Sequence, residues 1–313
     1  MSTTIVNVDN FIRAETNRMF ATVQAQSSIG TFSHWRQPAP LDNQTIIRLN
    51  RDTLYSAVIV DISQGAEIVI PEVGDRYASA MIINQDHFIN RIFHQPGTYS
   101  LTEEEFHTPY VLVGVRILAD PNDASDVAIV NELQDQLEVR SASNVAFVMP
   151  EYDEASFAET REALITLSRG LAGYSGSFGR KEEVNPVHHL IGTASAWGGL
   201  PESEAMYLNI DPKLPVREFS MTVHDVPVDA FWSISVYNAQ GFFEQTDRGL
   251  NSVNSVTANK NTDGSITVNF GTSEEDKPNY LRIMEGWNYM VRLYRPQSAI
   301  LDGTWTFPEI QPA

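Results

Sequence analysis

The sequence predicts a mainly β protein of the α+β class, with an N-terminal antiparallel β-sheet body, a helical middle and a C-terminal jelly-roll β-sandwich. Three observations support this order. Short β-branched and aromatic segments fill residues 45–118, and most gaps between them are too short for crossover helices, so we expect antiparallel pairing. Apolar residues recur at helical spacing within residues 121–197. Strand-like segments with the spacing of a sandwich follow, so we expect domains at residues 1–200 and 201–313.

The N-terminal body is expected to open with a helix. "NVDNFIRAETNRMFATVQAQ" places Phe11, Phe20 and Val23 near helical spacing, with Asp9 as the N-cap. Residues 27–40, which include two prolines, are expected to form a loop. Strands are then expected at "TIIRL", "YSAVIVDI", "AEIVIP", "YASAMIIN", "FINRIFH" and "YVLVGVRIL".

Three helices are expected in the middle of the chain. The first two cover "NDASDVAIVNELQDQLEV" and "DEASFAETREALITLSRGLAG", where Gly173 is the expected stop. The third starts at "NPVHHLIGTASAW", because Asn185 is a good N-cap and Pro186 suits the first helical position.

The last third of the chain returns to strands. These are expected at "AMYLNI", "FSMTVHDV", "AFWSISVYN", "SVNSVTANK", "SITVNFG", "YMVRLYRP" and "TWTFPE". The dipeptide Asp263-Gly264 predicts a hairpin turn between the two strands that flank it.

Composition excludes several classes of function. The 40 acidic residues against 21 Lys plus Arg give a net charge of −19, which repels phosphate backbones, so we expect no nucleic-acid partner. The absence of cysteine excludes disulfides, thiol nucleophiles and thiolate metal sites. No apolar run approaches the ~18 residues of a membrane span, and no signal peptide is visible. We expect a cytoplasmic protein, or a periplasmic one if a signal peptide was removed.

A polar corner at residues 50–53 is the strongest candidate for a site. Asn, Arg, Asp and Thr follow one another where the chain enters a buried strand, and buried polar groups must be paired or hydrogen-bonded. Arg76 precedes the neighbouring strand in the same way, so a structural Arg76–Asp52 bridge and a catalytic pair are both open. The corner is either a structural feature or one wall of a site.

A second candidate lies in "INQDHFINRIFHQPGTY". Asp86, His87 and His94 lie near strand ends and could ligate a divalent metal, or His87 could act as a general base. The alternative is an Asx turn at Asp86 with a partly exposed His87. The spacing matches no specific metal signature.

Two aromatic or hydroxyl positions complete the candidates. Trp197, followed by two glycines, could line a pocket or pack as the end of a helix. Ser175 in "GYSGSFG" lacks the strand-turn-helix context of a nucleophile elbow, so we interpret this stretch as a flexible connection.

Five stretches resemble a bacterial family with two modules, named domains of unknown function twelve-fifty-four (N-terminal) and twelve-fourteen (C-terminal). They are "NRDTLYSAVIVD", "DRYASAMIINQDH", "NPVHHLIGTASAWGG", "VDAFWSISVYNAQGFF" and "GWNYMVRLYRPQSAILDGTWTFP". The resemblance runs from about Thr31 to Pro312. It implies a coiled and bifurcated N-terminal sheet with helices, followed by a jelly roll. The family commonly has "NNDTLY", so Arg51 departs from its pattern. It implies no catalytic residues, although hydrolase or carboxylesterase labels attach to some members.

Two functions remain open. The first is a hydrolase acting on an ester or amide of a small organic acid. Its acid and base would be Asp52 and His87, and Tyr55 would donate to the oxyanion. We assign substrate binding to Arg51, Arg76, His34 and Trp197. The second is a ligand-binding or assembly protein without catalysis. Either way we expect a small-molecule ligand, a homo-oligomer and no membrane; no cofactor is required, although a divalent metal is possible.

Overall fold

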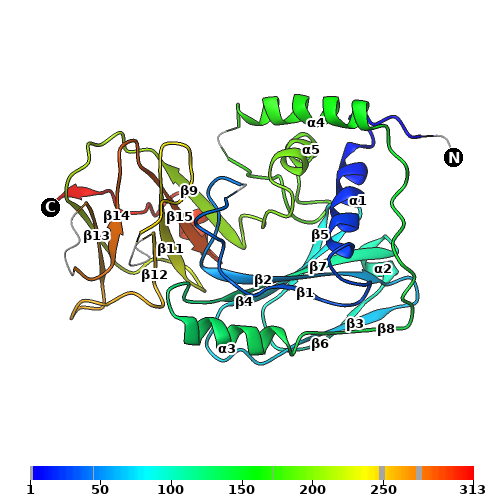
Figure 1. Cartoon of the computed structure of the whole chain (residues 1–313), viewed down its shortest axis with the longest axis horizontal. Helices are drawn as coiled ribbons and strands as arrows, with labels where there is room; N and C mark the ends of the chain where they lie inside the picture. Colours follow the sequence, from blue (N-terminus) through cyan, green and yellow to red (C-terminus); the bar gives the residue numbers. More distant parts are fainter. Residues whose placement is uncertain (1–2, 45, 172, 247–250, 273–276) are drawn as a thin grey trace. The chain divides into compact units, whose positions relative to one another are not determined.

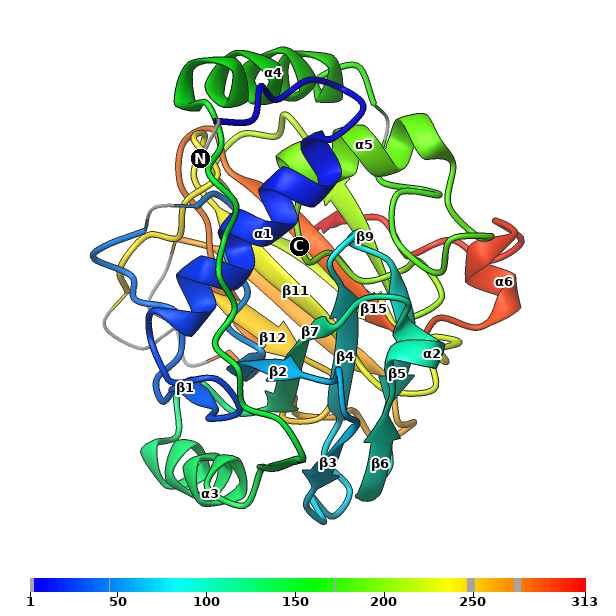
Figure 2. The same ribbon diagram turned by 90° about the vertical axis from the view of Figure 1, so that its right-hand side faces the viewer.

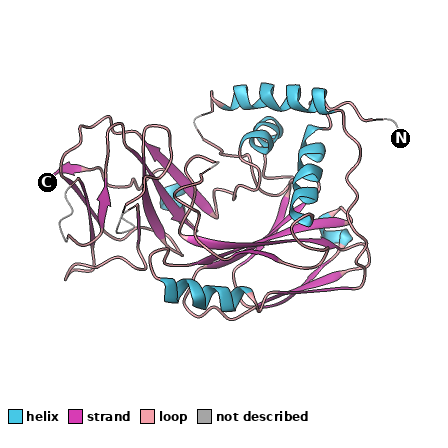
Figure 3. Cartoon of the chain, in the orientation of Figure 1, coloured by secondary structure: helices cyan, strands magenta, loops and turns pink. Residues whose placement is uncertain are grey.

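The computed structural model describes residues 3–44, 46–171, 173–246, 251–272 and 277–313. Within them the protein is mainly β with helices, as predicted, and strands dominate Figure 3. The described helices are α1 (Phe11–Gln24), α2 (Glu103–Phe106), α3 (Ala124–Gln134), α4 (Glu154–Ser168), α5 (Pro186–Ser195) and α6 (Ser298–Leu301). None of these described helices has the length and apolar character that crossing a membrane requires.

The chain divides into two compact units, each built from separate stretches of sequence. Unit 1 comprises Met1–Arg36, Tyr55–Ile117 and Ile129–Glu202. Unit 2 comprises Gln37–Leu54, Leu118–Ala128 and Ser203–Ala313. Two segments from the N-terminal half of the sequence, among them the polar corner at 50–53, therefore belong to the unit formed mainly by the C-terminal residues.

The described residues of unit 1 form two antiparallel sheets. A five-stranded sheet has the order β1-β2-β7-β4-β5 and a three-stranded sheet the order β6-β3-β8. In Figures 1 and 2, helices α1, α4 and α5 lie on one side of the larger sheet and the smaller sheet lies on the other. The strands are β1 (Ser33–Trp35), β2 (Thr53–Asp61), β3 (Ala66–Ile70), β4 (Ala78–Asn84), β5 (Ile89–Phe93), β6 (Gly97–Leu101), β7 (Tyr110–Leu118) and β8 (Glu138–Ser141).

Helices α1, α4 and α5 share an apolar core that orders this side of unit 1. Phe11 and Ala14 of α1 pack with Leu164 of α4 and with Ile191 and Ala194 of α5. Fully burying side chains of the size of Phe11, Leu164 and Ile191 contributes roughly 1.5–3 kcal/mol each. The core holds α5 in place, and α5 carries the histidine and threonine described below.

In the part of unit 2 that the structure describes, the strands form two four-stranded sheets, with the orders β14-β13-β10-β16 and β12-β11-β15-β9. Apolar side chains of both sheets meet in one core, which includes Phe219, Phe270, Trp232 and Val291. Figure 2 shows β12, β11, β15 and β9 side by side. The strands are β9 (Ala205–Ile210), β10 (Phe219–Val223), β11 (Trp232–Tyr237), β12 (Ser252–Asn254), β13 (Ile266–Gly271), β14 (Tyr280–Arg282), β15 (Asn288–Tyr294) and β16 (Gln311–Pro312). The jelly-roll connectivity stays a prediction.

Several predicted elements differ from the structure. Residues 46–49 of the expected strand "TIIRL" are irregular (Thr45 lies outside the described residues), whereas part of the expected loop forms β1. Gly264 does sit in a turn, with φ +84°, but β13 pairs with β10 and β14, so the predicted hairpin is wrong. Residues 304–309 form no strand. At Gly264 the pairing of β13 with strands distant in sequence outweighed the local turn signal.

The helix ends confirm one cap and correct two. The Asn185 side chain accepts hydrogen bonds from the backbone N–H groups of Val187 and His188, and Pro186 opens α5, as predicted. In α1 the N-cap is Asn10 rather than Asp9. Helix α4 ends at Ser168, before the predicted stop at Gly173.

Candidate functional site

A buried polar cluster lies in unit 2, on the face of β11 and β15 that points away from the apolar core. Neighbouring residues of a strand point to opposite faces. Trp232, Ile234 and Val236 of β11 belong to the core, so the residues between them face the other way. The irregular segment 37–52 contributes the remaining members. We call this set the Asp52 cluster; it consists of Arg48, Asn50, Asp52, Ser233, Ser235, Tyr237, Asn288, Arg292 and Tyr294.

Arg292 is the centre of the Asp52 cluster. It is 2% exposed, and its Nη1 donates to Ser235 Oγ at 2.9 Å. Its Nη2 donates to Tyr237 Oη at 2.7 Å and to the carbonyl oxygens of Arg48 and Leu49, each at 3.0 Å. Burial alone would lower the pKa of Arg292, but Tyr237, Asp52 and Tyr294 together raise it above its ordinary value. Arg292 is therefore a permanent cation inside unit 2.

Asp52 is the carboxyl group of the cluster. Its side chain is 1% exposed, and Oδ2 accepts a hydrogen bond from Ser233 Oγ at 2.5 Å. The other oxygen, Oδ1, is buried and has no hydrogen-bond partner among the described residues. Burial raises the pKa of the Asp52 carboxyl, and the Arg292 charge and the Ser233 hydrogen bond only partly offset this. A buried acceptor without a donor costs about 1–3 kcal/mol, so Oδ1 calls for an explanation.

The polar corner is largely a hydrogen-bonded structure. Asn50 Nδ2 donates to Tyr294 Oη at 3.0 Å and to Thr53 Oγ1 at 3.3 Å, and its Oδ1 accepts from the Asp52 N–H at 2.9 Å. Arg51 donates to the Ala39 carbonyl and lies outside these contacts. The corner thus owes its shape to Asn50, and its unused hydrogen-bonding capacity is at Asp52 Oδ1.

Arg48 brings a second guanidinium to the cluster. Its Nη2 donates to Asn288 Oδ1 at 3.3 Å, and its buried Nε has no acceptor among the described side chains and backbone. Its φ is +54°, a left-handed conformation that is uncommon for a residue with a Cβ. The N–H of Arg48 donates to the Gly241 carbonyl at 2.7 Å, which fixes this conformation.

His87 lies in unit 1 and is fully buried. Its Nε2 accepts from the Gly198 N–H at 3.0 Å. The Thr193 hydroxyl donates to the His189 carbonyl at 2.7 Å, so it accepts from His87 Nδ1–H, also at 2.7 Å. Burial, with added repulsion from His189, lowers the pKa of His87 well below its ordinary value. His87 is a neutral imidazole with both nitrogens engaged.

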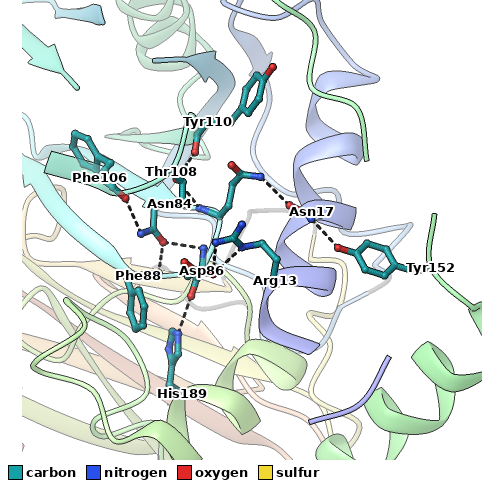
Figure 4. Close-up of polar contacts among 11 residues, drawn as sticks. Arg13, Asn17, Asn84, Asp86, Phe88, Phe106, Thr108, Tyr110, Tyr152 and His189 are labelled. Atoms are coloured by element: carbon teal, nitrogen blue, oxygen red, sulfur yellow. Dashed lines mark hydrogen bonds and ion pairs between the residues drawn. The ribbon is translucent and has the colours of Figure 1, made fainter. Parts of the chain in front are cut away.

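The turn before His87 is tied to α1 and α5, as Figure 4 shows. Asn84 Oδ1 accepts from the N–H groups of Asp86 and Phe88, so the amide closes the turn. The Asp86 carboxylate pairs with Arg13 of α1 at 2.7 Å, and the Asp86 carbonyl lies 3.1 Å from His189 Nε2 of α5. These contacts give the turn a structural role.

The predicted metal ligands do not form a metal-holding group. His94 Nδ1 lies 3.0 Å from the Ala78 carbonyl oxygen, while Asp86 and His87 make the contacts described above. Within the described ranges, no group of three or more His, Asp or Glu side chains is arranged to hold a metal ion. The divalent metal stays a prediction.

The other predicted site residues divide between the units. Arg51 and Asp52 belong to unit 2, and the remaining ones to unit 1. Trp197 stacks on His87, with ring centroids 5.0 Å apart, and donates to Thr16 Oγ1 at 3.2 Å, which fits its interpretation as the packed end of α5.

Two more predicted residues lie on the five-stranded sheet of unit 1, and one precedes it. The Tyr55 ring lies 5.5 Å from the guanidinium carbon of Arg116. His34 Nδ1 lies 2.8 Å from Ser56 Oγ. Arg76 lies in the turn before β4. The structure brings Trp197 and His87 together, and leaves Tyr55 and His34 in separate contacts.

Sequence reasoning missed most of the partners of Asp52. Arg292 was included in the strand "YMVRLYRP" and Ser233 in "AFWSISVYN" without a role. A signal was present, because Ser233, Ser235 and Tyr237 alternate with large apolar residues and a charged Arg292 interrupts an apolar strand. The spacing of residues could not show that this polar face of β11 and β15 packs against residues 48–52.

The comparisons with known proteins concern the family and the fold. Residues 29–141 match a family model described as "Protein of unknown function (DUF1254)", and residues 215–298 match "Protein of unknown function (DUF1214)". No curated protein has significant sequence similarity to the chain.

Two crystal structures resemble the whole chain. The VPA0106 protein from Vibrio parahaemolyticus has a TM-score of 0.77 at 17% identity, with 98% of this chain and 97% of that chain covered. An uncharacterised protein from Burkholderia cenocepacia has a TM-score of 0.53 at 13% identity, covering 97% and 86%. At these identities the likeness concerns the fold alone.

Proposed function

We propose that this chain, which belongs to a two-module family of proteins of unknown function, binds a small polar molecule at the Asp52 cluster. The two family matches confirm the family that the sequence motifs predicted. The names of the two modules state no activity. The observation that carries the proposal is Asp52 Oδ1, a buried oxygen without a hydrogen-bond donor among the described residues. A bound molecule with an O–H or N–H group would supply that donor.

Entry to the cluster requires movement of the segment that covers it. Asp52 and Arg292 are 1% and 2% exposed, so a ligand cannot reach them in the closed arrangement. Residues 37–44 and 46–52 contain no helix or strand. Gln44 holds this segment by exchanging two hydrogen bonds of 2.9 Å with the Phe243 backbone. Opening would also break the hydrogen bonds that Tyr237 and Arg292 donate to the carbonyl oxygens of this segment, so it would be a movement of the whole segment, as is known for segments that close over ligands.

Native mass spectrometry of the purified protein tests the proposal. We expect an extra small-molecule mass on the native protein that denaturation releases, and we expect Asp52→Asn to lose it. The asparagine amide keeps the shape but places N–H atoms where the ligand would donate. Asp211→Asn, an exposed acid in the same unit, is the matched control and should retain the mass. Circular dichroism would establish that Asp52→Asn is folded.

The proposal is wrong if the wild-type protein is bare and no compound in a panel of small organic acids, esters and amides changes its melting temperature. It is also wrong if Asp52→Asn folds and retains the same bound mass as the wild type.

A hydrolase acting on an ester or amide of a small organic acid is the second candidate, and one observation favours it. Burial raises the pKa of Asp52, so this carboxyl keeps its proton at higher pH than an exposed one and suits a general acid. His87 takes no part in this scheme, because both its nitrogens are engaged in unit 1. Hydrolysis of an ester panel that is lost in Asp52→Asn and retained in Asp211→Asn would support it; a panel without turnover would leave binding alone.

A further inference from the structure

We infer that the ligand of the Asp52 cluster is a small carboxylate that carries a hydroxyl group next to its carboxyl carbon. This inference rests on the proposed function and names the class of molecule that the site would take. It comes from three features of the cluster: its charge, its unused donor and its unused acceptor.

The charge of the Asp52 cluster is positive. The Asp52 cluster contains two guanidinium groups, Arg48 and Arg292, and one carboxyl group, that of Asp52. The cluster thus carries one net positive charge when Asp52 is ionised, and two when it is protonated. Arg292 is buried and Arg48 is half-buried, and removing charge from water without a counter-ion is costly. The cluster is cationic in a chain of net charge −19. An anionic ligand would balance it.

The unused donor is suited to a carboxylate. Arg48 Nε is buried without an acceptor among the described residues, and its Nη2 makes one long bond of 3.3 Å to Asn288. The Nε and Nη edge of a guanidinium binds the two oxygens of a carboxylate side by side. The backbone of Arg48 is fixed at both ends, since its N–H donates to Gly241 and its carbonyl accepts from Arg292. In the closed arrangement the guanidinium therefore extends from a backbone that is held in place.

The unused acceptor requires a donor on the ligand. Asp52 Oδ1 cannot be satisfied by a carboxylate, which only accepts when ionised. A hydroxyl on the carbon next to the carboxylate supplies the donor within a molecule small enough for a covered site. Arg48 and Asp52 are four residues apart in the chain, so their unused groups belong to the same short segment.

A matched set of ligands separates the two recognition elements. Glycolate has both the carboxylate and the hydroxyl, acetate lacks the hydroxyl, and glycolamide lacks the charge. For the wild-type protein we expect calorimetry to give glycolate the lowest Kd, with acetate and glycolamide at least about tenfold weaker, because a buried polar group left unpaired is penalised.

Two variants assign each preference to a residue. Arg48→Gln should abolish the preference for glycolate over glycolamide and keep the preference over acetate. Asp52→Asn should do the reverse. Arg282→Gln, which removes an exposed arginine of unit 2, should change neither. Circular dichroism of all three variants would show that they are folded.

The outcomes distinguish the inference from the proposed function. Suppose that binding of the ligand found by mass spectrometry requires Asp52, but glycolate binds no better than acetate or glycolamide. The inferred ligand class is then wrong, while the proposed binding site is still supported. If Arg48→Gln and Asp52→Asn leave both preferences unchanged, these residues do not recognise the ligand and the inference is wrong. If no molecule binds in an Asp52-dependent way, the proposed function fails as well.

Discussion

His87 is a histidine that the fold keeps neutral, and this makes the stability of the protein depend on pH. Its pKa is lowered well below the ordinary value by burial, so the unfolded chain gains a proton near pH 6.5 that the folded protein does not accept. The contribution of His87 to stability is complete above about pH 6.5 and decreases as the pH falls through the lowered pKa, by up to about 1.4 kcal/mol per pH unit.

Replacing His87 should flatten this dependence. The residue has φ +62°, which asparagine tolerates, so His87→Asn removes the titrating group without backbone strain. His107 has φ +60° and is exposed, so His107→Asn is the matched control. We expect urea unfolding at about pH 7 and about pH 5 to show a smaller loss of stability for His87→Asn than for the wild type or His107→Asn. Equal losses in all three proteins would contradict this account.

Asp52 shows what sequence could and could not predict about a single residue. An acid beside an arginine, an asparagine and a threonine at the entrance to a buried strand marked a site candidate on local grounds alone. The counter-ion that the sequence offered for Asp52 was Arg76, because it precedes the neighbouring strand in the same way. In the structure the positive charge that acts on Asp52 is that of Arg292. Well over half the sequence separates the two residues, so local spacing could not identify this partner.

Helix α5 illustrates which elements are predictable. Its start depends on two adjacent residues, an N-cap asparagine and a first-turn proline, and both acted as expected. The predicted hairpin at Gly264 failed because the turn is local but strand partners are chosen by packing across a whole sheet. Two adjacent residues therefore sufficed to predict the start of α5, whereas the turn at Gly264 did not predict which strands pair.

The cap of α5 should be measurable by mutation. Asn185→Ala removes the acceptor for two backbone N–H groups, so we expect a loss of about 1 kcal/mol in the free energy of unfolding. Asn185→Ser restores a capping oxygen and should recover most of that loss. Thermal or urea unfolding of both variants gives the comparison. Equal stability of Asn185→Ala and the wild type would mean that water replaces the cap at no cost.

At the scale of the whole molecule, the excess of acidic residues should make stability depend on salt. With a net charge of −19, like charges repel one another within the folded chain, and salt screens this repulsion. We expect the melting temperature to rise when KCl is increased from about 10 mM to about 200 mM. Sucrose, which adds no ions, serves as the reference solute. A melting temperature that falls on adding KCl would show that attractive ion pairs outweigh the repulsion.

The composition of unit 2 from separate stretches sets an order of events during synthesis. Asp52 emerges from the ribosome early, but Ser233, which binds its carboxylate, follows 181 residues later, and Arg292 binds the Arg48 carbonyl across 244 residues. Until then the only other part of unit 2 that has been made is Leu118–Ala128, and residues 37–54 lack the strands β11 and β15 that bind them. In a chain truncated after residue 202, residues 37–54 would therefore lack most of their packing partners, and we expect proteases to cut the chain within this segment.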